Sequence, residues 1–276
     1  MKYTVQSCKY VFKNFFYIFP FAILPALFLS ACLDEAALNA VMESFFAGDL
    51  RAWKFSELFL AISVLNFGSW QAILFGIGGI VAMVFCVALM MALMEKHMRI
   101  GKRTFNGIFS KLNDNFVSTC GYTFLLFGIY EGWTLIVAAL LFFVSRIHAT
   151  VLAYVFASVV FLGMHVVLLY AISLVYLWLP CMQITGFKTR EALYYSNQLA
   201  APVKWKILAG QLVFLLTVDA VICACALYAV NIYVFTALTT ALYAAMIMVY
   251  CVRMQIAYFD LDNIERADLK KPAYRR

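Results

Sequence analysis

Long apolar segments, separated by short polar connectors, dominate the hydrophobic pattern of this chain. A helix needs about 20 apolar residues to cross a bilayer core of ~30 Å. Runs of that length predict six membrane-spanning helices, over residues 15–33, 71–94, 117–145, 151–179, 207–230 and 233–252. The predicted fold class is therefore all-α: a polytopic bundle of six transmembrane helices, forming a single integral membrane domain over residues 1–276.

Two stretches of the chain lie outside these spans. The outer segment 34–70 is predicted to hold two short helices separated at Ala47-Gly48-Asp49, and its aromatic residues predict that it lies on the membrane. A break at residues 66–69 is expected before the second span, because one helix from Leu58 to Met94 would extend for about 55 Å. Residues 255–276 are expected to form a solvated C-terminal tail.

Short amphipathic helices are predicted before each pair of spans, at about residues 4–14, 105–116 and 189–200. Such helices lie in the interface, with the apolar face toward the lipid and cations at the headgroups. The pattern fits a threefold repeat of an interfacial helix followed by a transmembrane hairpin. It equally fits ordinary basic and aromatic anchors at the ends of inner loops, and the sequence leaves both open.

The positions of lysine and arginine predict the orientation. Cytoplasmic loops carry an excess of these residues. With both termini inside, 18 of the 21 fall on the inner side, and only Arg51, Lys54 and Arg146 fall outside. We therefore expect a multi-pass protein of a bacterial cytoplasmic membrane with both termini cytoplasmic. Its candidate lipid-headgroup contacts are Lys9, Lys13, Lys102, Arg103 and Lys111.

Composition agrees with this interpretation, since 66% of the residues are hydrophobic and only 13% are charged. The net charge is +7, and the basic residues lie beside apolar runs, which favours anionic lipids as partners and not nucleic acid. The eight cysteines contain no CxxC pair, and we interpret them as small apolar residues. Leu29-Ser30-Ala31-Cys32 also resembles a lipoprotein cleavage box, in which Cys32 would be lipidated. Pro20, Pro25 and the further spans favour an uncleaved first helix.

Three ionisable residues lie deep in apolar surroundings: Glu131, His165 and Asp219. Such groups are expensive in a membrane and face the bundle interior or a wet cavity. They form a candidate intramembrane polar site that could relay protons or hold a cation. Alternatively, each hydrogen-bonds a neighbouring helix and is structural. Gly128 and Gly132 bracket Glu131 in a pattern that permits close helix approach.

No catalytic, cofactor-binding or metal-binding motif is recognisable, so we expect no enzyme, cofactor or metal. The glycines at positions 76, 78 and 79 lie within a predicted span and predict tight helix packing, not a phosphate-binding loop.

A family resemblance rests on Tyr176-Leu177-Trp178-Leu179-Pro180, Gly186-Phe187, Ser196-Asn197 and Lys204-Trp205-Lys206. These motifs resemble those of the poorly characterised YciC-like and YesL-like bacterial membrane proteins. Those families are related in layout to the membrane domain of some glycerophosphodiester phosphodiesterases. The resemblance implies a six-helix inner-membrane protein and carries over no catalytic residue.

Two functions remain open. The first is a non-enzymatic accessory protein that organises membrane lipids, anionic lipids among them, or supports a partner membrane protein. The second is a small transporter or channel that uses Glu131, His165 and Asp219. Convergence of these three side chains on a cavity would favour the second.

Overall fold

In lipid, backbone amides and carbonyls must be hydrogen-bonded within the protein, so long apolar segments fold as helices. The computed structural model describes residues 2–229 and 231–269, and this part of the chain is all-α. The α-helices are α1 Lys2–Lys13, α2 Phe15–Cys32, α3 Glu35–Ala47, α4 Phe55–Ile62, α5 Trp70–Ile100, α6 Ile108–Ser145, α7 Thr150–Val175, α8 Trp178–Thr185, α9 Thr189–Ala200, α10 Lys204–Tyr228 and α11 Ile232–Leu261. Three short 3-10 helices lie at Leu50–Ala52, Ala201–Val203 and Ala267–Leu269.

Six of the described helical segments are long and apolar enough to cross a membrane, which confirms the six-span prediction. They contain α2, α5, α6, α7, α10 and α11. The predicted interfacial helix at 105–116 is not separate, because α6 runs without interruption from Ile108. No glycine or proline lies between Ile108 and Val117 to end the helix. The first and third predicted interfacial helices are present as α1 and α9.

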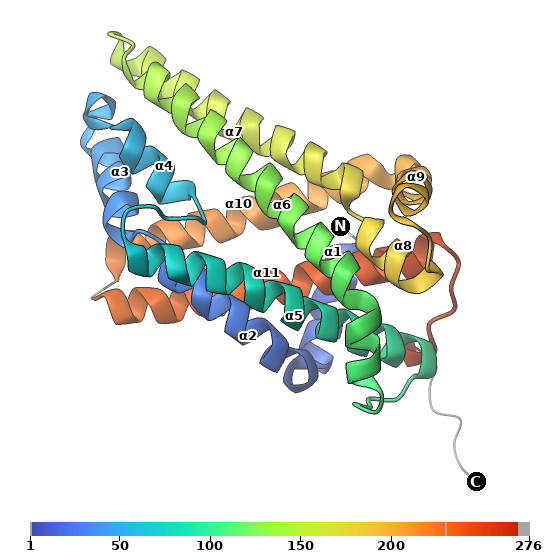
Figure 1. Ribbon diagram of the computed structural model, residues 1–276. Helices are drawn as coiled ribbons and strands as arrows, with labels where there is room; N and C mark the ends of the chain where they lie inside the picture. Colours follow the sequence, from blue (N-terminus) through green and yellow to red (C-terminus); the bar gives the residue numbers. More distant parts are fainter. Residues whose placement is uncertain (1, 230, 270–276) are drawn as a thin grey trace.

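Consecutive spans run antiparallel to one another (Figure 1). Helix α2 packs against α5 and α11, while α6 and α7 form a hairpin that contacts α5 through α6 and α10 through α7. Helices α8 and α9 lie at the same end of the bundle as α1, and α3 and α4 lie at the opposite end (Figure 1). We call these the terminal end and the opposite end.

Glycines explain the close packing of α5 on α2. A Cβ added at Gly79 would lie 2.9 Å from Leu29 Cδ2, and one at Gly78 would lie 3.1 Å from the ring of Phe28. The prediction of tight packing at these glycines is confirmed. Gly128 and Gly132 differ, because no atom would lie within 4 Å of an added Cβ there. Their pattern therefore brings no helix of the described chain into close approach.

Exposed aromatic side chains lie at both ends of the spans. Trp70, Tyr228 and Tyr233 are about four-fifths exposed at the opposite end, and Phe16 and Trp205 are exposed at the terminal end. Along α10, Trp205 and Tyr228 are separated by about 35 Å at ~1.5 Å per residue, close to a hydrocarbon core of ~30 Å. Aromatic residues gather at both membrane interfaces in this manner. The protein is a polytopic membrane protein.

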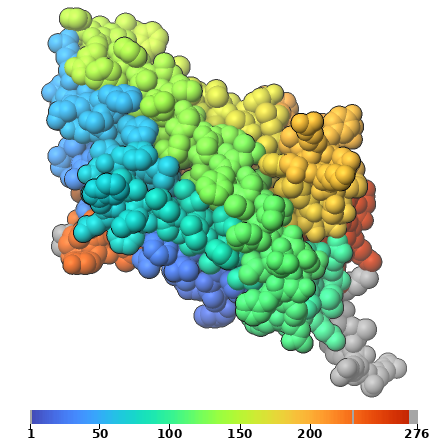
Figure 2. Space-filling model, in the orientation of Figure 1, coloured from blue at the N-terminus to red at the C-terminus, as the bar shows by residue number. Residues whose placement is uncertain are grey.

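The segment 34–70 has the expected break after α3, and its last part is attached to the bundle. Gly48 ends α3 with a left-handed φ of 84°, a conformation that glycine adopts without steric cost. Helix α4 packs against α6, and in Figure 2 this light-blue segment lies against the α6–α7 hairpin. The residues that follow α4 enter the bundle and reach Glu131. Residues 63–65 of the segment predicted to lie on the membrane are thus attached to a span, and their polar groups find an acceptor inside the protein.

The C-terminal region is also more ordered than predicted. Helix α11 continues to Leu261, so the tail begins after this residue and not at residue 255 as expected. The 3-10 helix at Ala267–Leu269 packs on α5, and the Ala267 carbonyl oxygen lies beside Gly101. Arg266 and Asp268 form an ion pair at 2.8 Å whose side chains are nearly buried. Residues 270–276 of the predicted tail lie outside the described residues.

Candidate functional site

The Glu131 carboxylate holds the non-helical segment that follows α4. Its Oε1 accepts hydrogen bonds from the backbone amides of Val64 at 2.8 Å and Leu65 at 3.0 Å. Its Oε2 accepts one from the Ser63 hydroxyl at 2.8 Å. Non-helical backbone is tolerated at membrane depth only where the protein satisfies its polar groups. Glu131 performs that role for two consecutive amides.

Neighbouring side chains complete the attachment of this segment. The Tyr130 hydroxyl donates to the Ile62 carbonyl at 2.8 Å, at the end of α4. The Cys32 thiol donates to the Val64 carbonyl at 2.6 Å, and the Asn66 amide donates to the Cys32 carbonyl at 3.2 Å. Cys32 is therefore buried between α2 and this segment, and α2 is a central helix that cleavage before Cys32 would remove.

The depth of the segment follows from α5. A Cβ added at Gly76 would lie 3.2 Å from the Val64 carbonyl oxygen. Gly76 lies six residues beyond the exposed Trp70, about 9 Å along the helix axis. The Glu131 interaction therefore lies within the apolar layer and not at its surface.

His165 and Asp219 form a second polar contact, between α7 and α10. The His165 Nε2 lies 3.0 Å from Asp219 Oδ2, and its Nδ1 lies 2.8 Å from the Phe161 carbonyl oxygen. A carbonyl only accepts, so Nδ1 carries a hydrogen. One proton therefore lies between Nε2 and the carboxyl group, on one atom or the other. The imidazole is 2% exposed, whereas the Asp219 side chain is 33% exposed.

The three candidate residues thus do not converge on one point. Two of them pair, and Glu131 binds a different segment. Aromatic rings lie between the two contacts: the Trp133 ring centroid lies 5.0 Å from that of His165 and 5.6 Å from that of Tyr130. Within residues 2–229 and 231–269, no group of three or more histidine, cysteine or acidic side chains could hold a metal ion.

The candidate headgroup contacts divide into two kinds. Lys9, Lys13, Lys102 and Lys111 are exposed at the terminal end. Arg103 instead donates from Nε to Asn14 Oδ1 at 2.8 Å and from Nη2 to the Lys13 carbonyl at 3.0 Å. Arg103 therefore ties the loop after α5 to the junction of α1 and α2.

Two buried polar residues have roles that sequence reasoning missed. His97 is buried, and its Nδ1 lies 2.7 Å from the Tyr10 hydroxyl, joining α5 to α1. Arg253 is also buried, and its Nη2 donates to the Ile207 carbonyl at 2.5 Å. The stretch from Met254 to Phe259, in which only Gln255 carries a side-chain amide or a charge, is a signal that α11 continues past this arginine. Without the partner helices, that signal does not reveal what Arg253 faces.

Comparison of the chain with protein-family models, curated proteins and solved structures gives no match.

Proposed function

We propose that this chain is a non-enzymatic protein of a bacterial cytoplasmic membrane that organises anionic lipid at its terminal end, or supports a partner membrane protein there. In this proposal both termini are cytoplasmic. The observation that carries it is the contrast between the two kinds of polar side chain. Glu131 and His165, inside the spans, are hydrogen-bonded to other parts of the chain, whereas lysines at the terminal end are exposed.

The intramembrane residues support a structural role. The Glu131 oxygens accept three hydrogen bonds from residues 63–65, and both ring nitrogens of His165 have partners. A group that must bind and release an ion needs free coordination positions, and these contacts occupy most of those on Glu131 and both ring nitrogens of His165. The expected resemblance to YciC-like and YesL-like proteins is compatible with this proposal, since it too implies no catalytic site.

The terminal end supports the contact with lipid. Helix α1 is amphipathic, with Phe12 83% exposed beside the exposed Lys9 and Lys13. Lys102 and Lys111 add two exposed charges on the loop after α5 and on α6. Each lysine near an anionic surface contributes roughly 1 kcal/mol of attraction, and salt weakens it.

The test replaces Lys9, Lys13, Lys102 and Lys111 together with glutamine and measures the anionic lipid that copurifies. We expect a clear loss of phosphatidylglycerol relative to the wild type. Arg103 stays unchanged, because its hydrogen bonds hold the α1–α2 junction. The control is Arg51→Gln with Lys54→Gln, which removes charge from the opposite end. An unchanged lipid profile in the fourfold variant would count against the lipid role.

A small transporter or channel remains the alternative, and one observation favours it. His165 Nε2 lies 3.0 Å from Asp219 Oδ2, and the Asp219 side chain is one-third exposed. The Asp219→Asn variant separates the two functions. A proton or cation flux in reconstituted vesicles that disappears in this variant, while thermal stability is retained, would overturn the accessory proposal. Absence of flux in the wild type would remove the alternative.

A further inference from the structure

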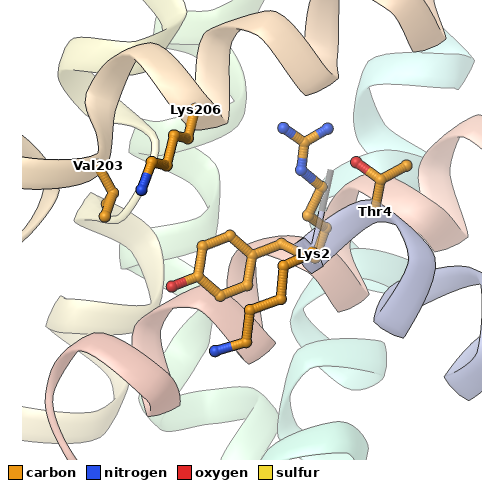
Figure 3. A pocket seen from close by; sticks show the side chains of 6 residues that line it. Lys2, Thr4, Val203 and Lys206 are labelled. Atoms are coloured by element: carbon orange, nitrogen blue, oxygen red, sulfur yellow. The ribbon is translucent and has the colours of Figure 1, made fainter.

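A cavity of about 280 Å³ lies at the terminal end, where α1, α10 and α11 meet. Its lining residues are Lys2, Tyr3, Thr4, Val203, Lys206 and Arg253. Figure 3 shows Lys2 and Thr4 on α1, opposite Lys206 on α10, with Val203 beside it. The volume exceeds the ~30 Å³ share of one water molecule several times, so a group the size of phosphate fits.

Arg253 is the buried member of this cavity. Its side chain is 3% exposed, and its Nε has no hydrogen-bond partner among the described residues. Within the described residues, its guanidinium donates one hydrogen bond, from Nη2 to the Ile207 carbonyl. A buried cation without a counter-charge is unfavourable, and arginine recognises phosphate through several N–H groups at once. The buried positive charge of Arg253 at the cavity wall therefore favours an anionic ligand.

The other lining groups add positive charge and donors. Lys206 is exposed at the rim, on the helix that also carries the Ile207 carbonyl. Lys2 contributes a third cation, although its Nζ pairs with Asp260 at 2.9 Å. Tyr3 also donates to Asp260, and burial and this bond raise the Tyr3 pKa to about 12, so its phenol stays neutral. Three cations thus outnumber the adjoining carboxylate.

Gly210 lies on α10 where this helix approaches α1 and α11 at the cavity. A Cβ there would lie 3.1 Å from the Thr4 hydroxyl and 3.4 Å from Arg253 Nη2. The glycine therefore lets α10 approach α1 and α11 at the point where the guanidinium lies.

We propose that this cavity binds a phosphate group, carried by a lipid headgroup or by free phosphate, with Arg253 and Lys206 as its direct ligands. The lipid source rests on the proposed function. Free phosphate does not, so the two proposals can fail separately.

The experiment uses the full chain. In a phosphate-free maltoside detergent, calorimetry measures binding of inorganic phosphate. In nanodiscs of phosphatidylcholine with or without phosphatidylglycerol, native mass spectrometry counts the retained phosphatidylglycerol. Binding of inorganic phosphate assigns the site to free phosphate, and retention of phosphatidylglycerol alone assigns it to the headgroup. If neither occurs in the wild type, the proposal is overturned.

Variants then locate the binding. Lys206→Gln, at an exposed position that leaves the fold intact, should weaken binding about tenfold, as loss of one charge-assisted hydrogen bond does. Arg253→Lys should weaken it further while keeping the buried charge. The matched control is Lys188→Gln, which removes the same charge at an exposed position outside the cavity and should leave this binding unchanged.

Equal weakening by Lys206→Gln and Lys188→Gln would overturn the proposal, because it would indicate general surface attraction. The variant without Lys9, Lys13, Lys102 and Lys111 distinguishes the two proposals. If it loses copurifying lipid while Lys206→Gln changes nothing, the proposed function stands and the cavity site falls.

Discussion

At the scale of single residues, Glu131 illustrates why an acid persists inside an apolar span. An intramembrane carboxylate is unfavourable by itself. Here it accepts from the Ser63 hydroxyl and from the backbone amides of Val64 and Leu65, which would otherwise lack an acceptor at that depth. The unfavourable burial of the carboxylate and that of the polar groups of residues 63–65 thus offset one another.

Replacing Glu131 with alanine should destabilise the protein. The two backbone amides would lose their acceptor, at about 1–3 kcal/mol each. Glu131→Gln keeps one acceptor oxygen and should lose only about 1 kcal/mol. Thermal unfolding in detergent measures both, with Glu43→Ala, at an exposed position, as the control. Equal melting temperatures for Glu131→Ala and the control would contradict this role.

Asp219→Asn tests the contact with His165. The asparagine amide can donate to Nε2 while Nδ1 still donates to Phe161, so stability should stay within about 0.5 kcal/mol of the wild type. Asp219→Leu removes the partner of a buried nitrogen and should cost about 1–3 kcal/mol. Unfolding of both variants in detergent gives the comparison. A large loss in Asp219→Asn would indicate that the ionised carboxylate is required.

The candidate polar residues could be found from the sequence, but their partners could not. An isolated acid or histidine in an apolar run is visible by itself. Pairing of His165 with Asp219 depends on the contact of α7 with α10, which no local pattern encodes. The role of Arg253 could not be predicted, because it follows a run that is already long enough to span and therefore counts among the inner-side cations of the C-terminal stretch.

At the scale of elements, we expect alanine substitutions of the glycines on α5 and α6 to have opposite effects on stability. Gly76→Ala places a Cβ 3.2 Å from the Val64 carbonyl oxygen, so α5 must move from the segment it holds. We expect destabilisation by about 1–3 kcal/mol, as for other overpacked sites. Gly128→Ala meets open space and should be neutral or stabilising by up to about 1 kcal/mol.

Thermal unfolding of the two glycine variants, in the same detergent, checks this prediction. Destabilisation by Gly128→Ala would mean that the exposed face of α6 packs against another molecule. A neutral Gly76→Ala would mean that residues 63–66 are not held tightly against α5.

Element boundaries show where periodicity succeeds and where it fails. Hydrophobic run length located all six spans, because the bilayer imposes a minimum length. It failed at the start of α6, since an amphipathic stretch and the span that follows form one helix when no residue breaks it. Pro180 shows the reverse: α7 ends at Val175, and α8 begins at Trp178, which places the proline in a first turn.

At the scale of the whole molecule, the orientation can be tested by labelling. In intact cells, an impermeant thiol reagent should modify Asp49→Cys and Asn231→Cys but not Lys111→Cys. The reason is the charge distribution, which assigns the terminal end to the cytoplasm. The wild type, with its native cysteines, gives the background. Labelling of Lys111→Cys from outside would reverse the topology.

The attachment of residues 63–66 to Glu131 also constrains the order of biosynthesis. Val64 precedes its acceptor by 67 residues. At about 5–20 residues per second, translation supplies Glu131 some 3–13 seconds later. Until then the amides of Val64 and Leu65 have no acceptor in lipid, so α4 must wait at the water interface. The segment between α2 and α5 therefore completes its folding only after α6 has left the ribosome and entered the bilayer.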